Sequence, residues 1–314
     1  MGDLLLNPEL WPRSVRPTML PETLVPHRLS LVRRLAELRR LYTGETDSSL
    51  MPAVTGGMQQ LDADDRLKIT ETLDNDYICR LLGENELPPP AARIRQALMP
   101  DAHCDAQREL ELAIAVAASR IGDYVRLRPP ANPVRPVRVF RMVRPQQDTL
   151  VLHLEAAALG PLLLEMVPRV TDGVLVGMPG LRARLCRRHI EVYLVDSDPA
   201  AVVSLANVSY RQWCAALAFA EAVDPDTEQW WLGNDPQPLT AHEVQALAEH
   251  DRAPGAARLT SAVLRRGRLF TGESWITFRR NGCGDVCLEW TDNPSLPWVA
   301  AKLLHPVFGR PCLP

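Results

Sequence analysis

Residues 137–155 read VRVFRMVRPQQDTLVLHLE, and this stretch decides the fold class. In its second half, Leu150, Leu152 and Leu154 alternate with other residues, which is typical of a strand with one buried face. Pro145 to Asp148 have the composition of a tight turn. We therefore predict two antiparallel strands, over residues 137–143 and 149–155.

The segment upstream of these strands is predicted to be helical. Apolar residues recur there at intervals of three and four, which is the spacing of one face of an α-helix. The prolines between Pro129 and Pro136 mark the point at which this period changes, because proline fits poorly in regular helix or sheet. We predict a helical region over 27–128, with helices at 28–42, 63–82, 91–98 and 105–124 and a loop at 45–61.

The segment downstream mixes strands and helices. Asn281-Gly282 predicts a hairpin turn between two short strands. Ser209 with Gln212, and Thr240 with Glu243, match the capping box that starts a helix. The region 129–314 is therefore expected to be α+β, with a mixed or mostly antiparallel sheet of about six strands and flanking helices. Its strands are expected at 174–177, 189–196, 275–280 and 285–290, and its other helices at 157–167 and 296–304.

Composition and charge argue against several classes of protein. The 314 residues are 46% apolar and 23% charged, which predicts a packed globular core. A net charge of −3 gives no general attraction to nucleic acid or to an anionic membrane. No stretch reaches the roughly 18 apolar residues of a membrane span. The first residues lack the pattern of a secretory signal, so we expect a cytoplasmic protein whose seven cysteines are thiols.

Residues 173–206 carry the pattern of a cofactor-binding unit. A predicted strand runs into Gly177-Met178-Pro179-Gly180, and Asp196 lies at the end of the next predicted strand. Glycines let a ligand approach the backbone closely, and an acid in that place can bind ribose hydroxyls. The segment resembles the first β-α-β unit of class I S-adenosylmethionine-dependent methyltransferases. The resemblance implies that Gly177, Gly180 and Asp196 bind the cofactor.

The alternative for this segment is an ordinary turn that binds no ligand. Pro179 stands where the family usually has a glycine, and residues 207–265 offer no candidates for the further parallel strands of that fold. Apart from S-adenosylmethionine under this resemblance, we predict no cofactor.

Cys214 is the candidate nucleophile of the chain. It lies just inside the helix predicted to start at Ser209, and a helix N-terminus acidifies a thiol. A cysteine hydrolase would also need a base, for which His242, His250 and His305 are the downstream choices. The alternative is a small apolar side chain packed beside Trp213.

The spacing of histidines and cysteines predicts no metal site. The candidate ligand pairs are Cys283 and Cys287, His103 and Cys104, and His242 and His250. None of them has a spacing that places two ligands on one face of a helix or turn.

Arginine dominates the basic residues, since Lys68 and Lys302 are the only lysines. Arginines gather in three groups, at 33–40, 182–188 and 265–268. A nucleic-acid-binding protein would need these groups to converge, with aromatic side chains to stack on bases. Because 5% of the chain is aromatic, we expect solvated helix faces paired with acidic residues instead.

The proline-rich residues 1–26 are interleaved with apolar residues, which predicts an extended docking arm. Tryptophan is enriched in protein interfaces, so the candidate partner-binding residues are Leu10, Trp11, Trp230, Trp231 and Trp298. We expect a non-enzymatic adaptor or structural subunit of a larger assembly that binds other protein subunits. The alternatives are the methyltransferase-like enzyme, the cysteine hydrolase and a nucleic-acid-binding protein.

Overall fold

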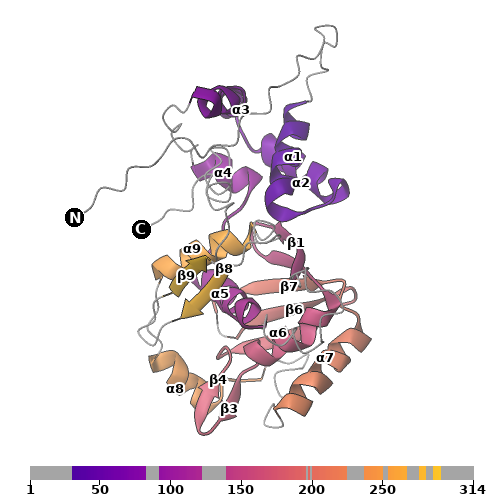
Figure 1. Ribbon diagram of the computed structural model, residues 1–314, viewed down its shortest axis with the longest axis vertical. Coiled ribbons are helices and arrows are strands. Elements are labelled where there is room, and N and C mark those ends of the chain that lie inside the picture. Colours follow the sequence, from indigo (N-terminus) through magenta and orange to yellow (C-terminus); the bar gives the residue numbers. More distant parts are fainter. Residues whose placement is uncertain are drawn as a thin grey trace, which may run out of the picture. The chain divides into compact units, whose positions relative to one another are not determined.

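The protein is an α+β protein with helices at its N-terminal side, as the periodicity predicts. The computed structural model describes residues 30–82, 92–121, 139–195, 197–198, 200–224, 237–249, 254–266, 276–280 and 286–290. Figure 1 shows four helices gathered at one end of the body that starts at Leu31, with a five-stranded sheet beyond them. The main sheet has five strands, one fewer than expected.

The four N-terminal helices enclose a small core of their own. They are α1 (Leu31–Thr43), α2 (Asp47–Gln59), α3 (Ala63–Leu82) and α4 (Ala92–Leu98). Leu35, Leu50, Ile69 and Leu98 contribute one buried side chain from each helix. Helix α2 lies where we expected a loop that contains Gly56 and Gly57. Burial of Leu50, Val54 and Met58 on one face of the helix outweighs the low helix propensity of its proline and glycine residues.

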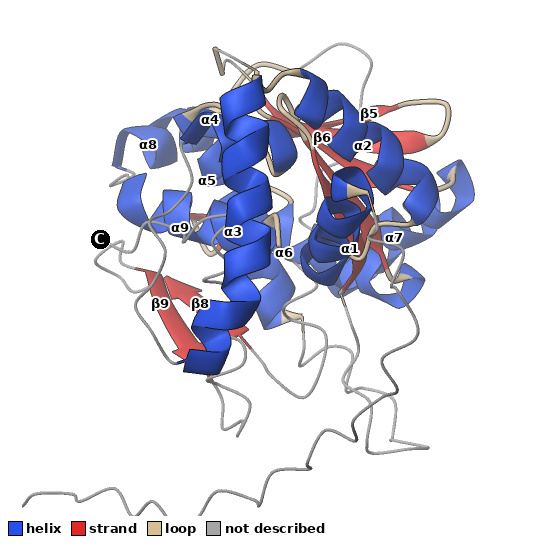
Figure 2. Ribbon diagram, turned by 90° about the horizontal axis from the view of Figure 1, so that it is seen from above, coloured by secondary structure: helices blue, strands red, loops and turns tan. Residues whose placement is uncertain are grey.

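The main sheet has the strand order β1-β2-β7-β6-β5. The first two strands, β1 (Phe140–Pro145) and β2 (Leu150–Leu154), form the predicted antiparallel pair. Strand β7 (Val202–Ala206) lies parallel to β2, and β6 (His189–Leu194) and β5 (Leu181–Leu185) continue antiparallel. The parallel pair β2–β7 makes the sheet mixed. Figure 2 shows the separate two-stranded ribbon of β8 (Ile276–Arg280) and β9 (Val286–Trp290).

One face of the sheet carries the main hydrophobic core. Leu152, Val192 and Val203 are fully buried on this face. They pack in one cluster with α5 (Asp105–Arg120), the short 3-10 helix η3 (Ala156–Ala158) with α6 (Leu159–Met166), α7 (Tyr210–Val223) and α9 (Pro254–Leu264). Residues on the opposite face are mostly polar and half-buried, among them His189, Glu191 and Ser204. The strands therefore alternate between a dry face and a polar face.

Strands β5 and β7 correct two expectations. Neither of these two segments is among the strands predicted from the sequence. In β5, Leu181 and Ala183 point into the core while Arg182 and Arg184 alternate with them. In β7, Val203 and Leu205 are buried between β2 and β6. Both segments are therefore strands because tertiary contacts bury every second side chain.

Three local predictions are confirmed. Ser209 and Gln212 form a reciprocal capping box at the start of α7. Thr240 and Glu243 do the same at the start of α8 (Ala241–Glu249). The hairpin β8–β9 pairs in the expected antiparallel sense.

None of the helices formed by the described residues combines the length and the apolar character that a membrane crossing requires.

Candidate functional site

A cavity of about 990 Å³ runs along one face of helix α5. Its middle is apolar, because Leu112, Ala113 and Val116 of α5 face it. The opposite wall comes from the end of β4 (Val174–Val176), the turn that follows β4, and helix α8. That wall contributes Leu175, Met178, Leu239, Ala246 and Leu247.

The charged side chains of the cavity lie toward its two ends. Asp105 and Arg108 pair with each other at the start of α5. Arg120 at the end of α5 lies 3.5 Å from the Glu165 carboxylate of α6. Since α5 has 16 residues, the lining helix is about 24 Å long. The cavity is therefore long and apolar in its middle, with polar ends.

The predicted cofactor turn, Gly177 to Gly180, forms part of the cavity wall. Both glycines have positive φ, at 88° and 78°. A Cβ on Gly177 would lie 2.1 Å from the Val167 carbonyl oxygen, so only glycine fits there. The Gly180 N–H donates to Glu243 at 2.8 Å, and the Met178 N–H donates to Met166 at 2.9 Å. These two donors of the turn are therefore already satisfied by the protein.

The β-α-β unit implied by the resemblance to methyltransferases is not formed. Strand β4 pairs antiparallel with β3 (Arg169–Thr171), outside the main sheet. After the glycine turn the chain enters strand β5, which is antiparallel to β6, where that unit requires a helix. Asp196 lies outside the described residues, while its neighbours Ser197 and Asp198 line the cavity.

Glu243 lies buried behind the wall opposite α5, where it joins the glycine turn to the start of α8. It is fully buried and accepts two hydrogen bonds from the buried Arg182 guanidinium, at 3.0 and 3.2 Å. It also accepts the N–H groups of Gly180 and Thr240. Burial alone would raise the pKa of Glu243, but these four hydrogen bonds and the Arg182 charge outweigh it, so the pKa is lowered.

Two further arginines join the N-terminal helices to the sheet. Arg39 of α1 bonds Glu45 and also donates to the carbonyls of Leu98 and Pro145. Arg265, which follows α9, forms a bidentate pair with Glu111. It also donates to the carbonyls of Pro100 and Gln146. These residues lie one or two positions after Leu98 and Pro145, whose carbonyls Arg39 contacts.

The expectation of solvated arginine faces is therefore wrong for part of each arginine group. Arg39, Arg182, Arg265 and Arg266 are each at most 2% exposed. The expected pairing with acidic residues is found, but three of these pairs lie in the interior. Arginine suits such positions because its planar fork satisfies several acceptors at once.

Cys214 lies in the second turn of α7. The helix begins at Tyr210, so Cys214 is its fifth residue, and the effect of the helix dipole is concentrated in the first turn. The thiol interacts with the Tyr210 hydroxyl, and this contact raises the pKa of Tyr210. Neighbouring Trp213 is buried in the main core. Of the histidines considered as its base, His250 and His305 lie outside the described residues.

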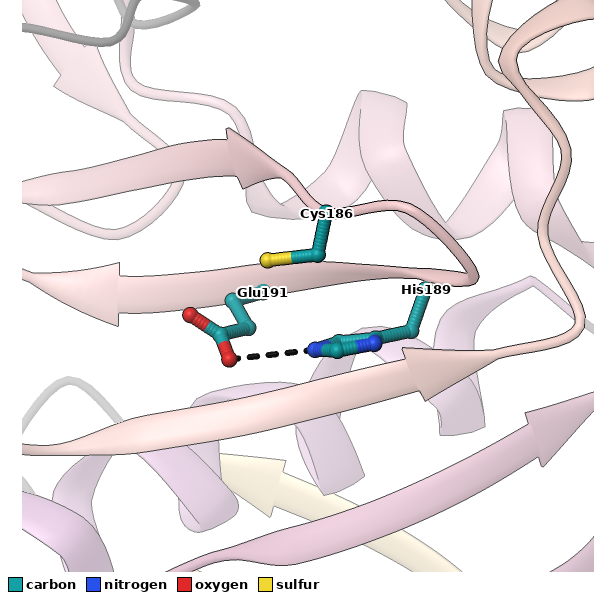
Figure 3. A group of neighbouring side chains, drawn as sticks. All are labelled: Cys186, His189 and Glu191. Carbon is teal, nitrogen blue, oxygen red and sulfur yellow. Dashed lines mark hydrogen bonds and ion pairs between the residues drawn. The ribbon is translucent and has the colours of Figure 1, made fainter.

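A cluster that the sequence analysis did not consider lies at the tip of the β5–β6 hairpin. Figure 3 shows the side chains of Cys186, His189 and Glu191 directed toward one another. One ligand atom from each lies within 4.8 Å of the other two. Glu191 Oε1 is 3.1 Å from His189 Nε2, and its other oxygen accepts from Arg184. Alternation of side chains across a two-residue turn could have revealed this cluster from the sequence. It was missed because β5 was not predicted as a strand.

The electrostatics of this cluster are balanced between burial and hydrogen bonding. Partial burial would raise the pKa of Glu191, but the hydrogen bonds from His189 and Arg184 lower it overall. Burial, and then the Glu191 charge, raise the pKa of the Cys186 thiol. Cys104, Cys186 and Cys214 do not form disulfides.

The predicted partner-binding residues lie outside the described residues. These are Leu10, Trp11, Trp230, Trp231 and Trp298. Comparison with known proteins finds no match to a protein-family model, to a curated protein or to a solved structure.

Proposed function

We propose that the protein is a non-enzymatic adaptor or structural subunit that binds an apolar helical segment of a partner protein along α5. The observation that carries this proposal is the cavity between α5 and α8. Helix α5 forms one long wall, and the end of β4, the glycine turn and Ala246 and Leu247 of α8 line the other, so an apolar helix placed between them would pack against both.

The lining of the cavity supports a protein segment as the ligand. Leu112, Val116 and Leu247 offer apolar contacts along the groove, and charged side chains lie toward its ends. An apolar centre with a polar rim is the usual composition of a protein interface.

A matched pair of variants in α8 tests this proposal. Ala246 lines the cavity, whereas Ala248 is exposed on the same helix and does not line it. We expect Ala246→Arg to place a charge in the groove, while Ala248→Arg adds the same side chain to solvent. The tagged full chain would be used to capture partners from its host at low and high salt, with recovery read by mass spectrometry.

The expected result is a stoichiometric protein that survives high salt with the wild type and Ala248→Arg and is lost with Ala246→Arg. Equal recovery with all three proteins would exclude the groove as the binding site. A lone monomer by native size-exclusion chromatography, with no partner captured, would contradict the adaptor function itself.

A small-molecule ligand in the same cavity is the second candidate. It is favoured by the two left-handed glycines, Gly177 and Gly180, which line the cavity together with Ser197 and Asp198. S-adenosylmethionine is the ligand to test, by isothermal titration calorimetry of the purified chain. Absence of binding heat at millimolar ligand would remove this candidate.

A further inference from the structure

We propose that Cys186, His189 and Glu191 form a binding site for a zinc-type divalent metal ion at the tip of the β5–β6 hairpin. This site lies outside the cavity along α5, and the inference does not depend on the proposed function.

The pleat of the two strands brings the three side chains to one face. Arg184 and Glu191 are directly opposite each other in the antiparallel register, and Leu185 pairs with Ile190. The next opposed pair is Cys186 and His189, since the Cys186 N–H donates to the His189 carbonyl at 3.0 Å. Because alternate residues share a face, Cys186 lies on the face of Arg184, and His189 lies on that of Glu191. A tight turn at Arg187 and Arg188 therefore fixes the spacing of the ligands.

The distances suit a small tetrahedral ion. In proteins Zn²⁺ binds sulfur at about 2.3 Å and nitrogen or oxygen at about 2.0–2.2 Å, which places neighbouring ligands about 3.3–3.7 Å apart. His189 Nε2 and Glu191 Oε1 are 3.1 Å apart, and all three ligand atoms lie within 4.8 Å of one another. Small side-chain rotations therefore suffice to bring all three onto one ion.

The donor set favours zinc over hard cations. A thiolate, an imidazole and a carboxylate together provide sulfur, nitrogen and oxygen, whereas Mg²⁺ and Ca²⁺ prefer oxygen alone. A thiolate and a carboxylate also balance the charge of a divalent ion. Three protein ligands leave a fourth position for water or for a group on a partner.

Arg184 positions one of the ligands. Its guanidinium donates twice to Glu191 Oε2, at 2.9 and 2.5 Å, which leaves Oε1 directed at His189. Its carbon atom Cζ also lies 5.5 Å from the centre of the Tyr193 ring. Such outer contacts commonly orient the ligands of a metal site.

The test uses Co²⁺ as a spectroscopic probe for the full-length chain after chelator treatment and dialysis. A cysteine thiolate bound to Co²⁺ gives a ligand-to-metal charge-transfer band in the near ultraviolet, which free Co²⁺ lacks. We expect this band to depend on Cys186 and to saturate when one Co²⁺ is bound per chain. Added Zn²⁺ should displace the Co²⁺ and remove the band.

Ligand and control variants separate this site from other thiols and histidines. We expect Cys186→Ser to abolish that saturable band, and His189→Ala to weaken Co²⁺ binding at least about 10-fold. Cys214→Ser and His153→Gln should leave it unchanged, because neither residue belongs to the cluster. Circular dichroism would show that each variant is folded. A wild type without the band, or a band that persists in Cys186→Ser, would overturn the proposal.

Discussion

Arg182 and Glu243 form an ion pair whose side chains are 1% and 0% exposed, with 3.0 Å between Nη1 and Oε1. The same carboxylate accepts the N–H groups of Gly180 and Thr240. One buried side chain therefore fixes the edge strand β5, the glycine turn and the start of α8. The glycine turn and α8 form part of the cavity wall opposite α5.

Removal of Glu243 should strongly destabilise the fold. We expect Glu243→Ala to lower the free energy of unfolding by about 3–5 kcal/mol, because it leaves the Arg182 charge buried without its partner. The double change Arg182→Met with Glu243→Leu should cost less than this single change, since no charge remains inside. Urea denaturation followed by circular dichroism measures both.

The neighbouring pair Arg184 and Glu191 provides the control. Its side chains are 52% and 20% exposed, so we expect Glu191→Ala to cost less than about 1 kcal/mol. Similar losses in Glu243→Ala and Glu191→Ala would show that burial does not set the strength of these pairs.

Alanine substitutions at Gly173 and Gly177 distinguish the cost of backbone strain from the cost of a steric clash. Both have positive φ, but a Cβ on Gly173 meets open space, whereas one on Gly177 lies 2.1 Å from the Val167 carbonyl oxygen. We expect Gly173→Ala to cost about 1–2 kcal/mol from strain alone. Gly177→Ala should cost about 1–3 kcal/mol more because of the clash. Equal thermal unfolding midpoints for the two variants would contradict this.

Adjacent glycines in helix α2 should respond in opposite ways to the same substitution. A Cβ on Gly56 meets nothing within 4 Å, so Gly56→Ala should stabilise the protein by about 0.5–1 kcal/mol through helix propensity. A Cβ on Gly57 would lie 2.2 Å from the Ala97 carbonyl oxygen, so Gly57→Ala should destabilise it by about 1–3 kcal/mol. Equilibrium denaturation in urea decides the sign, and a stabilised Gly57→Ala would contradict the contact between α2 and α4.

His153 on the polar face of the sheet should make stability depend on pH. Burial, then the charges of Arg144 and Arg141, lower the pKa of His153, and the Asn207 amide donates to its Nδ1 at 3.1 Å. Its contribution to stability is therefore fully present above the ordinary value of 6.5 and is lost as pH falls through the lowered value.

The pH effect can be measured with urea denaturation at pH 7.5 and pH 5. The wild type should lose more stability on acidification than His153→Gln does. Arg144→Gln should lie between them, because it removes one of the two cations that lower the pKa of His153. Identical pH dependence in the wild type and His153→Gln would show that this histidine titrates alike in the folded and unfolded chains.

Local patterns in the sequence predicted the parts of the fold that local interactions determine. The capping boxes at Ser209 and Thr240 and the β1–β2 pair follow from residues close together in the chain. Strand β7 could not be recognised in this way, because it forms by burial of Val203 and Leu205 between strands from distant segments.

The candidate sites depended even more on distant contacts. Nothing near Arg39 or Arg265 in the chain shows that each bonds backbone carbonyls about 60 to 165 positions away. The sequence pattern marked the glycine turn as a candidate cofactor site, but the conformation of the turn is explained by contacts with Val167 and Glu243, which only the tertiary structure brings near.

The arrangement of Arg39 and Arg265 limits how this protein can evolve by exchange of segments. The two guanidinium groups bind four carbonyls from two short stretches, Leu98 to Pro100 and Pro145 to Gln146. A recombination event that replaced residues 31–100 would also remove Arg39 and the carbonyl stretch from Leu98 to Pro100. The sheet would then inherit a buried cationic side chain with half of its backbone acceptors missing. We therefore expect the N-terminal helices to be exchanged only together with the sheet that they contact.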